Sequence, residues 1–420
     1  MTTTTTSAGT SAGTLADPVE VMLRLLTPEG KRDPYPLYEK MRAHGAVVSL
    51  GGAHVVVTGY AECARALREP DLLSTDAAVQ DARMPGWRDH SSWRWLTRNM
   101  LFSNDPNHER YRRFFGSAFS ARSVAAWQPL VERVADEVVE HVAVLGAGCA
   151  VVDLVPEFSY RFAISVIGEL LGIPPEERAG MRGIIGDITT ALDPIGDLSE
   201  LERGDSGMDR LADWTTELVR ARRARPGSDL TSAFIKASDD SGELSEQELI
   251  ANLMLLIVAA AEAPQDLLSN MVRLALEHPE HAERLRDEPD SPFAEGFVEE
   301  TLRYDPAVQA LNRVAARDMR FFGEHIAGGT PVTLLIAAGN RDPRRFDRPD
   351  VFDPTRPDNQ PLTLSGGAHF CLGAPLARME ARTVVPRLLR RFPRMRLADR
   401  PTFRDQLVQR GHATLPVVTK

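Results

Sequence analysis

One cysteine lies in a glycine-rich segment where its sulfur could bind a metal. Cys371 belongs to the run Leu-Ser-Gly-Gly-Ala-His-Phe-Cys-Leu-Gly-Ala-Pro-Leu-Ala-Arg, residues 364–378. Gly366, Gly367 and Gly373 let the backbone bend closely around the sulfur and aim N–H groups at it. A helix is predicted to begin directly after the loop, and its positive end favours the thiolate form of a cysteine. Cys371 is therefore predicted to be a soft, electron-rich metal ligand.

The other two cysteines, Cys63 and Cys149, lie in ordinary amphipathic or apolar sequence, and we expect both to be buried free thiols. Three cysteines far apart in the chain do not suit a disulfide framework. Their number and spacing therefore predict a reducing compartment and a cytoplasmic protein. A hydrolase that uses Cys371 with His369 is a weaker alternative, because no strand–turn pattern supports the cysteine and no third residue orients the histidine.

A histidine and an arginine one helical turn apart form a second candidate motif. His108 and Arg112 lie in Asp-Pro-Asn-His-Glu-Arg-Tyr-Arg-Arg, residues 105–113, and their spacing places both on one helix face. A guanidinium beside an imidazole would hold an acidic cofactor group well. Taken alone, the motif fits an ordinary surface helix better.

The longest predicted helix, Glu246 to Glu277, contains an alanine-rich segment that ends in a proline. This segment is Ala-Ala-Ala-Glu-Ala-Pro, residues 259–264. Pro264 removes the N–H bond to the carbonyl of Ala260, which predicts a kink and leaves that oxygen available to a water or a substrate. In the simpler interpretation, residues 259–263 allow close helix packing and Glu262 forms a salt bridge.

Together these motifs resemble those of the cytochrome P450 family of haem-thiolate oxygenases. The cysteine loop of that family reads Phe-Gly-x-Gly-x-His-x-Cys-x-Gly. This chain has Leu364 and Ser365 at the first two positions and keeps four others, which are Gly367, His369, Cys371 and Gly373. The resemblance covers nearly the whole chain after its first residues and implies that Cys371 is the axial ligand of a haem b iron. It also implies that four side chains hold the haem propionates: His108, Arg112, Arg313 and His369.

The same resemblance assigns the alanine-rich segment to the pocket above the haem. The family reads Ala-Gly-x-Glu/Asp-Thr-Thr where this chain has residues 259–264, so Ala260 lies at the cofactor and Pro264 follows the reacting centre. Glu262 is retained. Ala263 replaces a threonine whose hydroxyl helps to hold water at the bound oxygen and to pass protons to it. The resemblance therefore implies that protons reach the oxygen by another route.

A further pair, Glu300 and Arg303, lies in another predicted helix. Taken alone, a carboxylate and a guanidinium three residues apart indicate a solvated pair that contributes roughly a few tenths of a kcal/mol. The resemblance instead implies a scaffolding role, in which this Glu-x-x-Arg pair ties its helix to the meander before the cysteine loop, here including Phe352 to Arg356.

Composition and charge limit the possible partners. The chain has 420 residues, of which 43% are hydrophobic, and a formal net charge of −10. This negative charge argues against nucleic acid and anionic lipid as partners. The longest strongly apolar run, Leu253 to Ala261, is much shorter than the roughly 20 residues of a membrane span, so no membrane partner is predicted.

Six arginines around and after the cysteine loop form a candidate docking face for an acidic electron carrier, although a solvated arginine-rich helix fits them equally well. They are Arg378, Arg382, Arg387, Arg390, Arg391 and Arg394. Pro386 lies among them and predicts that the helix after the loop is shortened or bent.

Helical periodicity dominates and predicts a mainly α fold with a small β lobe, and residues 1–15 are predicted to be a disordered tail. The resemblance implies that residues 16–420 form a single P450-like haem domain. Breaks are predicted at residues 85–90, 193–206 and 238–242, and a long loop at 340–367. The predicted helices are Tyr35–His44, Ala61–Leu67, Val124–Val144, Tyr160–Leu171, Met208–Arg223 and Glu246–Glu277. The predicted strands are Val47–Leu50, His54–Thr58 and Pro331–Ala337, with Gly51 and Gly52 joining the first two as a hairpin.

The resemblance implies a monooxygenase that oxidises, and by default hydroxylates, a small organic molecule in specialised metabolism. Electrons are expected from a separate ferredoxin or flavodoxin, because the haem domain accounts for the length of the chain. Ala263 leaves open an atypical oxidase, a coupling enzyme or an enzyme that uses peroxide. A haem-binding sensor or carrier without catalysis is the alternative from another class.

Overall fold

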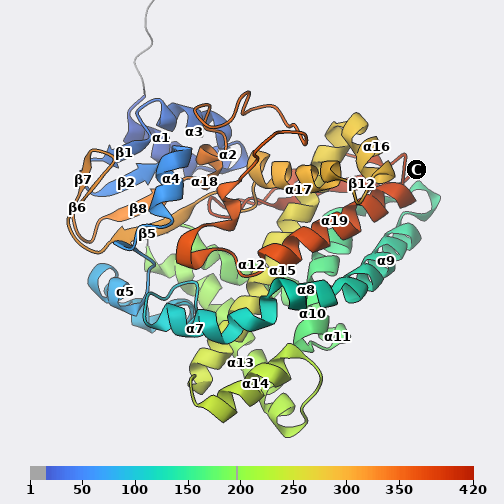
Figure 1. Ribbon diagram of the computed structural model, residues 1–420, viewed down its shortest axis with the longest axis horizontal. Coiled ribbons are helices and arrows are strands. Elements are labelled where there is room, and N and C mark those ends of the chain that lie inside the picture. The colour runs from blue at the N-terminus through green and yellow to red at the C-terminus, as the bar shows by residue number, and fades with distance from the viewer. Residues whose placement is uncertain (1–15, 195–196) are drawn as a thin grey trace, which may run out of the picture.

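The computed structural model describes residues 16–194 and 197–420. Residues 1–15, which the sequence predicts to be a disordered tail, lie outside the described residues. Helices form most of the molecule, and the largest sheet lies to one side of them, which confirms the predicted mainly α fold with a small β lobe (Figure 1).

A 32-residue helix, α15 (Glu246–Glu277), runs through the middle of the molecule, as predicted (Figure 1). A capping box starts it, because the Ser245 hydroxyl accepts from the N–H of Glu248, and the Glu248 carboxylate accepts from the N–H of Ser245. By length and composition α15 could cross a membrane. However, 61% of its most apolar window is buried inside the protein, as is usual for the central helix of a folded core.

The other long helices pack around α15 and around one another. Several of them contact α15: α10 (Arg161–Leu171), α13 (Glu202–Ala224), α14 (Leu230–Ser241), α16 (Pro279–Asp287), α17 (Pro292–Tyr304) and α19 (Ala374–Arg391). Three more complete this region: α7 (Asn107–Gly116), α8 (Ala121–Ala126) and α9 (Gln128–Leu145). Their apolar faces form the largest core, in which Phe115, Phe158 and Phe297 are fully buried.

Several predicted helix boundaries differ from the structure. The run Val124–Val144 is two helices, α8 and α9, because Pro129 has no N–H to donate and is accommodated in the first turn of a new helix. Helix α14 continues through most of the predicted break at 238–242 and ends at Gly242, which has a left-handed φ of +64°. Helix α13 begins inside the predicted break at 193–206. Helix α19 continues past Pro386, so its predicted shortening is wrong.

The β lobe is built on a five-stranded sheet with the order β1-β2-β8-β5-β3. Its strands are β1 (Val47–Leu50), β2 (His54–Val57), β8 (Pro331–Leu334), β5 (Leu311–Ala315) and β3 (Leu72–Leu73). The predicted hairpin is confirmed, since β1 and β2 are antiparallel and Gly51 and Gly52 have φ values of +60° and +76°, as the tight turn requires. The strand predicted at residues 331–337 ends earlier, because α18 (Ile336–Gly339) follows it.

The remaining elements are short. The helices are α1 (Pro18–Leu25), α2 (Pro28–Arg32), α3 (Tyr35–Arg42), α4 (Tyr60–Ala66), α5 (Ala77–Arg83), α6 (Ser91–Leu96), α11 (Pro175–Arg178) and α12 (Met181–Thr189). The strands are β4 (Val151–Asp153), β6 (Met319–Phe321), β7 (Glu324–Ile326), β9 (Arg396–Leu397), β10 (Thr402–Phe403), β11 (His412–Thr414) and β12 (Pro416–Val418). One π-helical turn, η4 (Val155–Tyr160), precedes α10.

The predicted long loop is confirmed, because residues 340–367, all of which the structure describes, form no α-helix or strand. A 3-10 turn, η7 (Leu362–Leu364), lies near its end, and a second, η8 (Gly367–His369), leads into Cys371. The loop therefore delivers the cysteine segment to the first turn of α19.

Candidate functional site

Cys371 lies between η8 and the first residue of α19. Its main-chain N–H donates to the carbonyl of Leu364 (2.8 Å), which closes the loop around the sulfur. Burial raises the pKa of the Cys371 thiol, while hydrogen bonds from the N–H groups of Gly373 and Ala374 oppose that rise. A half-buried sulfur that accepts main-chain N–H bonds is a suitable thiolate ligand for iron.

Two residues of this loop have backbone conformations that favour glycine. Gly367 has a φ of +63°, and a Cβ atom there would lie 2.6 Å from the carbonyl oxygen of Leu67, so this position has no room for a side chain. Ser365 has φ +63° and ψ −162°, a region that is essentially restricted to glycine. Its hydroxyl is buried and has no hydrogen-bond partner among the described residues. The serine therefore occupies a strained position.

Four basic side chains from three parts of the chain converge beside the cysteine loop. His108 and Arg112 come from α7, Arg313 from β5 and His369 from η8. The ring centroids of His108 and His369 are 4.1 Å apart. The pKa of His369 is lowered to about 3, first by burial and then by the positive charges of Arg313, His108 and Arg112. The structure thus brings together all four residues that the resemblance assigned to the propionates.

This basic cluster has little matching negative charge. Burial lowers the pKa of Arg313 to about 10, and its Nη1 donates to the carbonyl oxygen of residue 312 (2.8 Å). Arg112 donates to the carbonyl oxygen of residue 370 (2.6 Å). Within the described chain, the carboxylate in salt-bridge range of the cluster is Asp105, 3.5 Å from His108 Nδ1. Since buried positive charge is costly without an anion, the cluster fits a group with carboxylates, such as the two propionates of haem.

The alanine-rich segment is an uncovered patch on an otherwise buried helix. Most of α15 is buried, but Ala259 is exposed, and Val258, Ala260 and Ala263 are partly exposed. Leu255, one turn earlier, is partly exposed as well, so the patch follows one helix face. Helix α15 is unbroken across Pro264, which lies inside it. This stripe is a part of the central α15 helix that the other described side chains leave uncovered.

Glu262 points into a buried ion network. Its carboxylate pairs with Arg404, which follows β10 and also pairs with Asp266, one turn further along α15. Gln265 donates to the Asp266 carboxylate (3.1 Å), whose pKa burial raises to about 8. The salt bridge of the simpler interpretation is therefore present. Sequence reasoning missed Arg404 and Asp266, because no spacing pattern connects a helix in the middle of the chain to a residue near its end.

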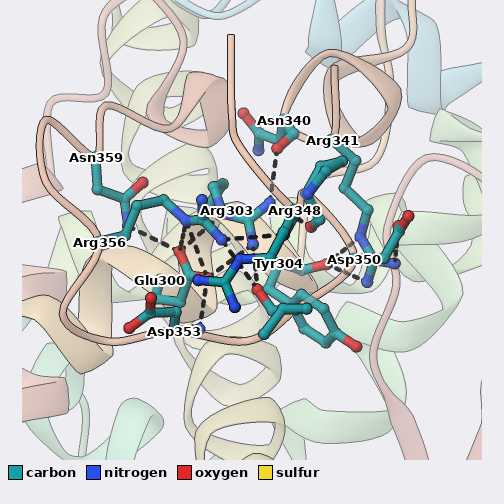
Figure 2. Close-up of polar contacts among 12 residues, drawn as sticks. Glu300, Arg303, Tyr304, Asn340, Arg341, Arg348, Asp350, Asp353, Arg356 and Asn359 are labelled. Carbon is teal, nitrogen blue, oxygen red and sulfur yellow. Dashed lines mark hydrogen bonds and ion pairs between the residues drawn. The ribbon is translucent and has the colours of Figure 1, made fainter. Parts of the chain in front are cut away.

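The Glu300–Arg303 pair is fully buried, so the solvated pair expected from its spacing alone is wrong. Figure 2 shows both side chains between α17 and the long loop. Arg303 donates two 2.7 Å hydrogen bonds to Glu300, and further bonds to the carbonyl oxygens of residues 340 and 349. Glu300 in turn accepts from the Asp353 N–H (2.9 Å) and Asn359 (3.0 Å) and pairs with Arg356. These contacts fix the meander that precedes the cysteine loop.

The predicted basic docking face is largely neutralised. Four of its six arginines have carboxylate partners: Arg378 with Glu299, Arg382 with Glu295, Arg387 with Glu132 and Asp136, and Arg391 with Glu140. The interpretation of a solvated arginine-rich helix, with ion pairs that the sequence did not predict, therefore describes most of this segment better than an open basic surface.

The two remaining cysteines differ from each other. Cys63 is buried, its thiol donates to the carbonyl oxygen of Val57 (3.5 Å), and burial raises its pKa. Cys149 is exposed and has a φ of +65°, so its predicted burial is wrong. It follows Gly148, which also has a positive φ (+69°), in a turn beyond the end of α9 that turns the side chain toward solvent.

Comparison with known proteins decides the family. The cytochrome P450 family model matches residues 206–408. Cytochrome P450 107B1 of Saccharopolyspora erythraea is 34% identical, over 86% of this chain and 88% of its own length. The chain belongs to the cytochrome P450 family. The monooxygenase PikC of Streptomyces venezuelae is a further relative of this P450, 32% identical over 97% of this chain and 96% of its own.

Solved P450 structures have the same fold. Ligand-free CYP164A2 of Mycobacterium smegmatis superposes with a TM-score of 0.86 and 31% identity, over 95% of this chain and 99% of that chain. Membership of the family makes this P450 a haem b protein with a cysteine thiolate ligand and an oxidoreductase of the monooxygenase class. It therefore favours the enzyme over the sensor or carrier.

Proposed function

We propose that this P450 hydroxylates a small organic molecule in specialised metabolism, with Cys371 as the axial ligand of its haem. The observation that carries the proposal is the half-buried thiol beside four basic groups, near which Asp105 is the carboxylate of the described residues in salt-bridge range. PikC is named a monooxygenase, and another relative, from Pseudonocardia autotrophica, is named vitamin D(3) 25-hydroxylase. These names support a hydroxylation without identifying the substrate.

In this proposal each group around the cofactor has a definite task. The haem supplies reductive activation of dioxygen and transfer of one oxygen atom to carbon. The thiolate of Cys371 donates electron density, and the N–H groups of Gly373 and Ala374 limit that donation by bonding to the sulfur. His108, Arg112, Arg313 and His369 would hold the haem propionates.

We further propose that electrons come from a separate ferredoxin or flavodoxin. Bacterial P450s generally receive electrons from ferredoxin-type partners, which supports a carrier of this kind. Because most of the arginines after the cysteine loop are ion-paired, such a carrier would compete with their acidic partners. Charge reversal at Arg382 and Arg390 is expected to weaken carrier binding; unchanged binding would remove this face as the docking site.

The distal pocket must deliver protons without the usual threonine. We propose that a substrate hydroxyl or an ordered water takes the place of the missing alcohol at Ala263, with Glu262 held in position by Arg404. The carbonyl of Ala260, which has no N–H partner at Pro264, can accept a hydrogen bond from that water or substrate. Ala263→Thr is then expected to leave product per electron pair unchanged or to lower it, because the new hydroxyl competes for the same place.

A second candidate function is an oxidative coupling or a reaction that uses peroxide. Ala263 favours it, since such reactions depend less on proton delivery, and CxnD, named for C–S bond formation, superposes with a TM-score of 0.81 and 30% identity. Turnover in labelled dioxygen with a reductase distinguishes the two. Insertion of one labelled oxygen atom supports hydroxylation, whereas product without label, or turnover with peroxide alone, supports the second candidate.

The assignment of Cys371 has a direct spectroscopic test. The carbon monoxide complex of the reduced parent protein is expected to show the absorption band of a thiolate-ligated haem. Cys371→Ser is expected to lose that band, while Cys149→Ser, at the exposed cysteine, keeps it. An unchanged band in Cys371→Ser contradicts the proposal.

A further inference from the structure

Two histidines and a glutamate gather at the junction of α15 and α16, outside the haem site described above. His278 caps the end of α15, and Glu280 and His281 lie in the first turn of α16. The N–H of His281 donates to the carbonyl oxygen of His278 (3.0 Å). This turn of backbone fixes the two imidazoles relative to each other.

Each of the three side chains places one ligand atom close to those of the other two. Glu280 Oε1 lies 3.7 Å from His278 Nδ1 and 3.8 Å from His281 Nε2. All three ligand atoms lie within 4.8 Å of one another. In a tetrahedral zinc site with bonds of about 2.1 Å, neighbouring ligand atoms are about 3.4 Å apart. Small rotations of these side chains therefore suffice to bring all three atoms into bonding range of one ion.

A buried aromatic ring supports both imidazoles from one side. Phe352 is 4% exposed. Its ring centroid lies 5.3 Å from that of His278, nearly parallel at 27°, and 6.0 Å from that of His281. Phe293 contacts His281 as well, with ring centroids 5.8 Å apart. These contacts limit the rotation of the imidazoles. Metal binding therefore has to restrict the two side chains less than it would if they moved freely.

Charge and exposure also suit a metal ion. Across the described residues, the carboxylate of Glu280 has no salt-bridge partner except the two histidines. The side chains of His278 and His281 are 34% and 24% exposed, and that of Glu280 is 67% exposed, so water can reach a fourth position. Two imidazole nitrogens and one carboxylate suit Zn²⁺ and its neighbours among the transition metals. They are too few oxygen ligands for Ca²⁺.

We propose that His278, Glu280 and His281 form a binding site for a divalent transition-metal ion, with Zn²⁺ as the probe and water as the fourth ligand. The ion would join the end of α15 to the first turn of α16. It acts on the fold and takes no part in the haem reaction, so the proposal stands independently of the proposed function. Because only the folded protein binds the ion, the apparent stability of the protein rises with the zinc concentration.

Equilibrium dialysis of the haem-loaded protein against Zn²⁺ tests the site. The Cys149→Ser background is used, because an exposed thiol can bind zinc by itself. The measurement is made at about pH 8, where free imidazole is neutral. We expect one zinc ion per chain at saturation, and binding weaker by at least about tenfold in His281→Gln and in Glu280→Gln.

His325→Gln is the matched control, because His325 is an exposed histidine on β7. It is expected to bind zinc as tightly as the background protein. The proposal is overturned if no saturable binding is found, if both site variants bind as the background does, or if the control loses affinity equally. The carbon monoxide spectrum of each variant shows that the haem domain is folded, so weaker binding in the site variants reports on the ligands themselves.

Discussion

Replacing Ser365 with glycine is expected to stabilise the protein. The conformation of this residue (φ +63°, ψ −162°) costs a side chain about 1–3 kcal/mol. Its buried hydroxyl lacks a partner in the described chain, and leaving such a group unsatisfied adds about 1 kcal/mol or more. Glycine removes both costs but gives the unfolded chain more freedom, which offsets about 1 kcal/mol. The expected net gain in the free energy of unfolding is about 1–3 kcal/mol.

The assay is thermal unfolding of the haem-loaded protein by calorimetry and by loss of the haem absorption band. At about 2.1 cal/mol/K of unfolding entropy per residue, this gain raises the Tm by roughly 1–3 °C. Ser365→Ala is the matched control, because it removes the hydroxyl and keeps the Cβ. We expect the glycine variant to exceed the alanine variant by up to about 2 kcal/mol, which is the strain of about 1–3 kcal/mol less the offset of about 1 kcal/mol. If the alanine variant is the more stable of the two, the loop is not strained at Ser365 and the reasoning is refuted.

Three further changes test other parts of the site. Glu300→Gln leaves the buried side chain of Arg303 without its charged partner. It is expected to lower the free energy of unfolding, measured by denaturation in guanidinium chloride, by about 3–5 kcal/mol. The same change at the exposed Glu217 should cost less than about 1 kcal/mol. Under the proposed haem assignment, Arg313→Gln removes a charge-assisted bond to a propionate worth about 1.5–3 kcal/mol, so haem should transfer to apomyoglobin roughly tenfold faster or more. Arg317→Gln, at an exposed side chain, should leave the rate unchanged. Burial raises the pKa of Glu380 from 4.5 to about 8, so the folded protein keeps a proton that the unfolded chain loses above pH 4.5. The free energy of unfolding should therefore fall by about 2–3 kcal/mol between about pH 6 and 8 and level off above that range. The Glu380→Gln variant should not show this fall; a parallel fall in the variant contradicts the assignment.

The sequence predicted those parts of the site that are determined by residues close to them in the chain. The apolar run, its caps and the proline that follows define α15, and the glycines around Cys371 identify the loop from its own residues. The hairpin of β1 and β2 is likewise set by two adjacent glycines with positive φ. In each case the residues that determine the conformation lie within a few positions of it.

The parts that the sequence did not predict depend on contacts between distant segments. Arg404 and Asp266 are 138 residues apart, and only the packing of the C-terminal strands beside α15 brings them together. The burial of Glu300 is similar, because the long loop covers it and supplies its partners. Ser365 was visible as a departure from the family pattern, but its strain depends on the φ value that the folded loop imposes.

Charge balance links the cofactor to the stability of the fold. His108, Arg112, Arg313 and His369 come from a helix, a strand and a turn, and each would be less costly in water than in this cluster. Burial lowers the pKa of His369, and the positive charges of Arg313, His108 and Arg112 lower it further. Under the proposed haem assignment, two propionates supply the missing negative charge, so haem binding offsets a cost that folding alone leaves in place. Removal of haem is therefore expected to loosen α7, β5 and the cysteine loop together, because these segments share the charge that the cofactor neutralises.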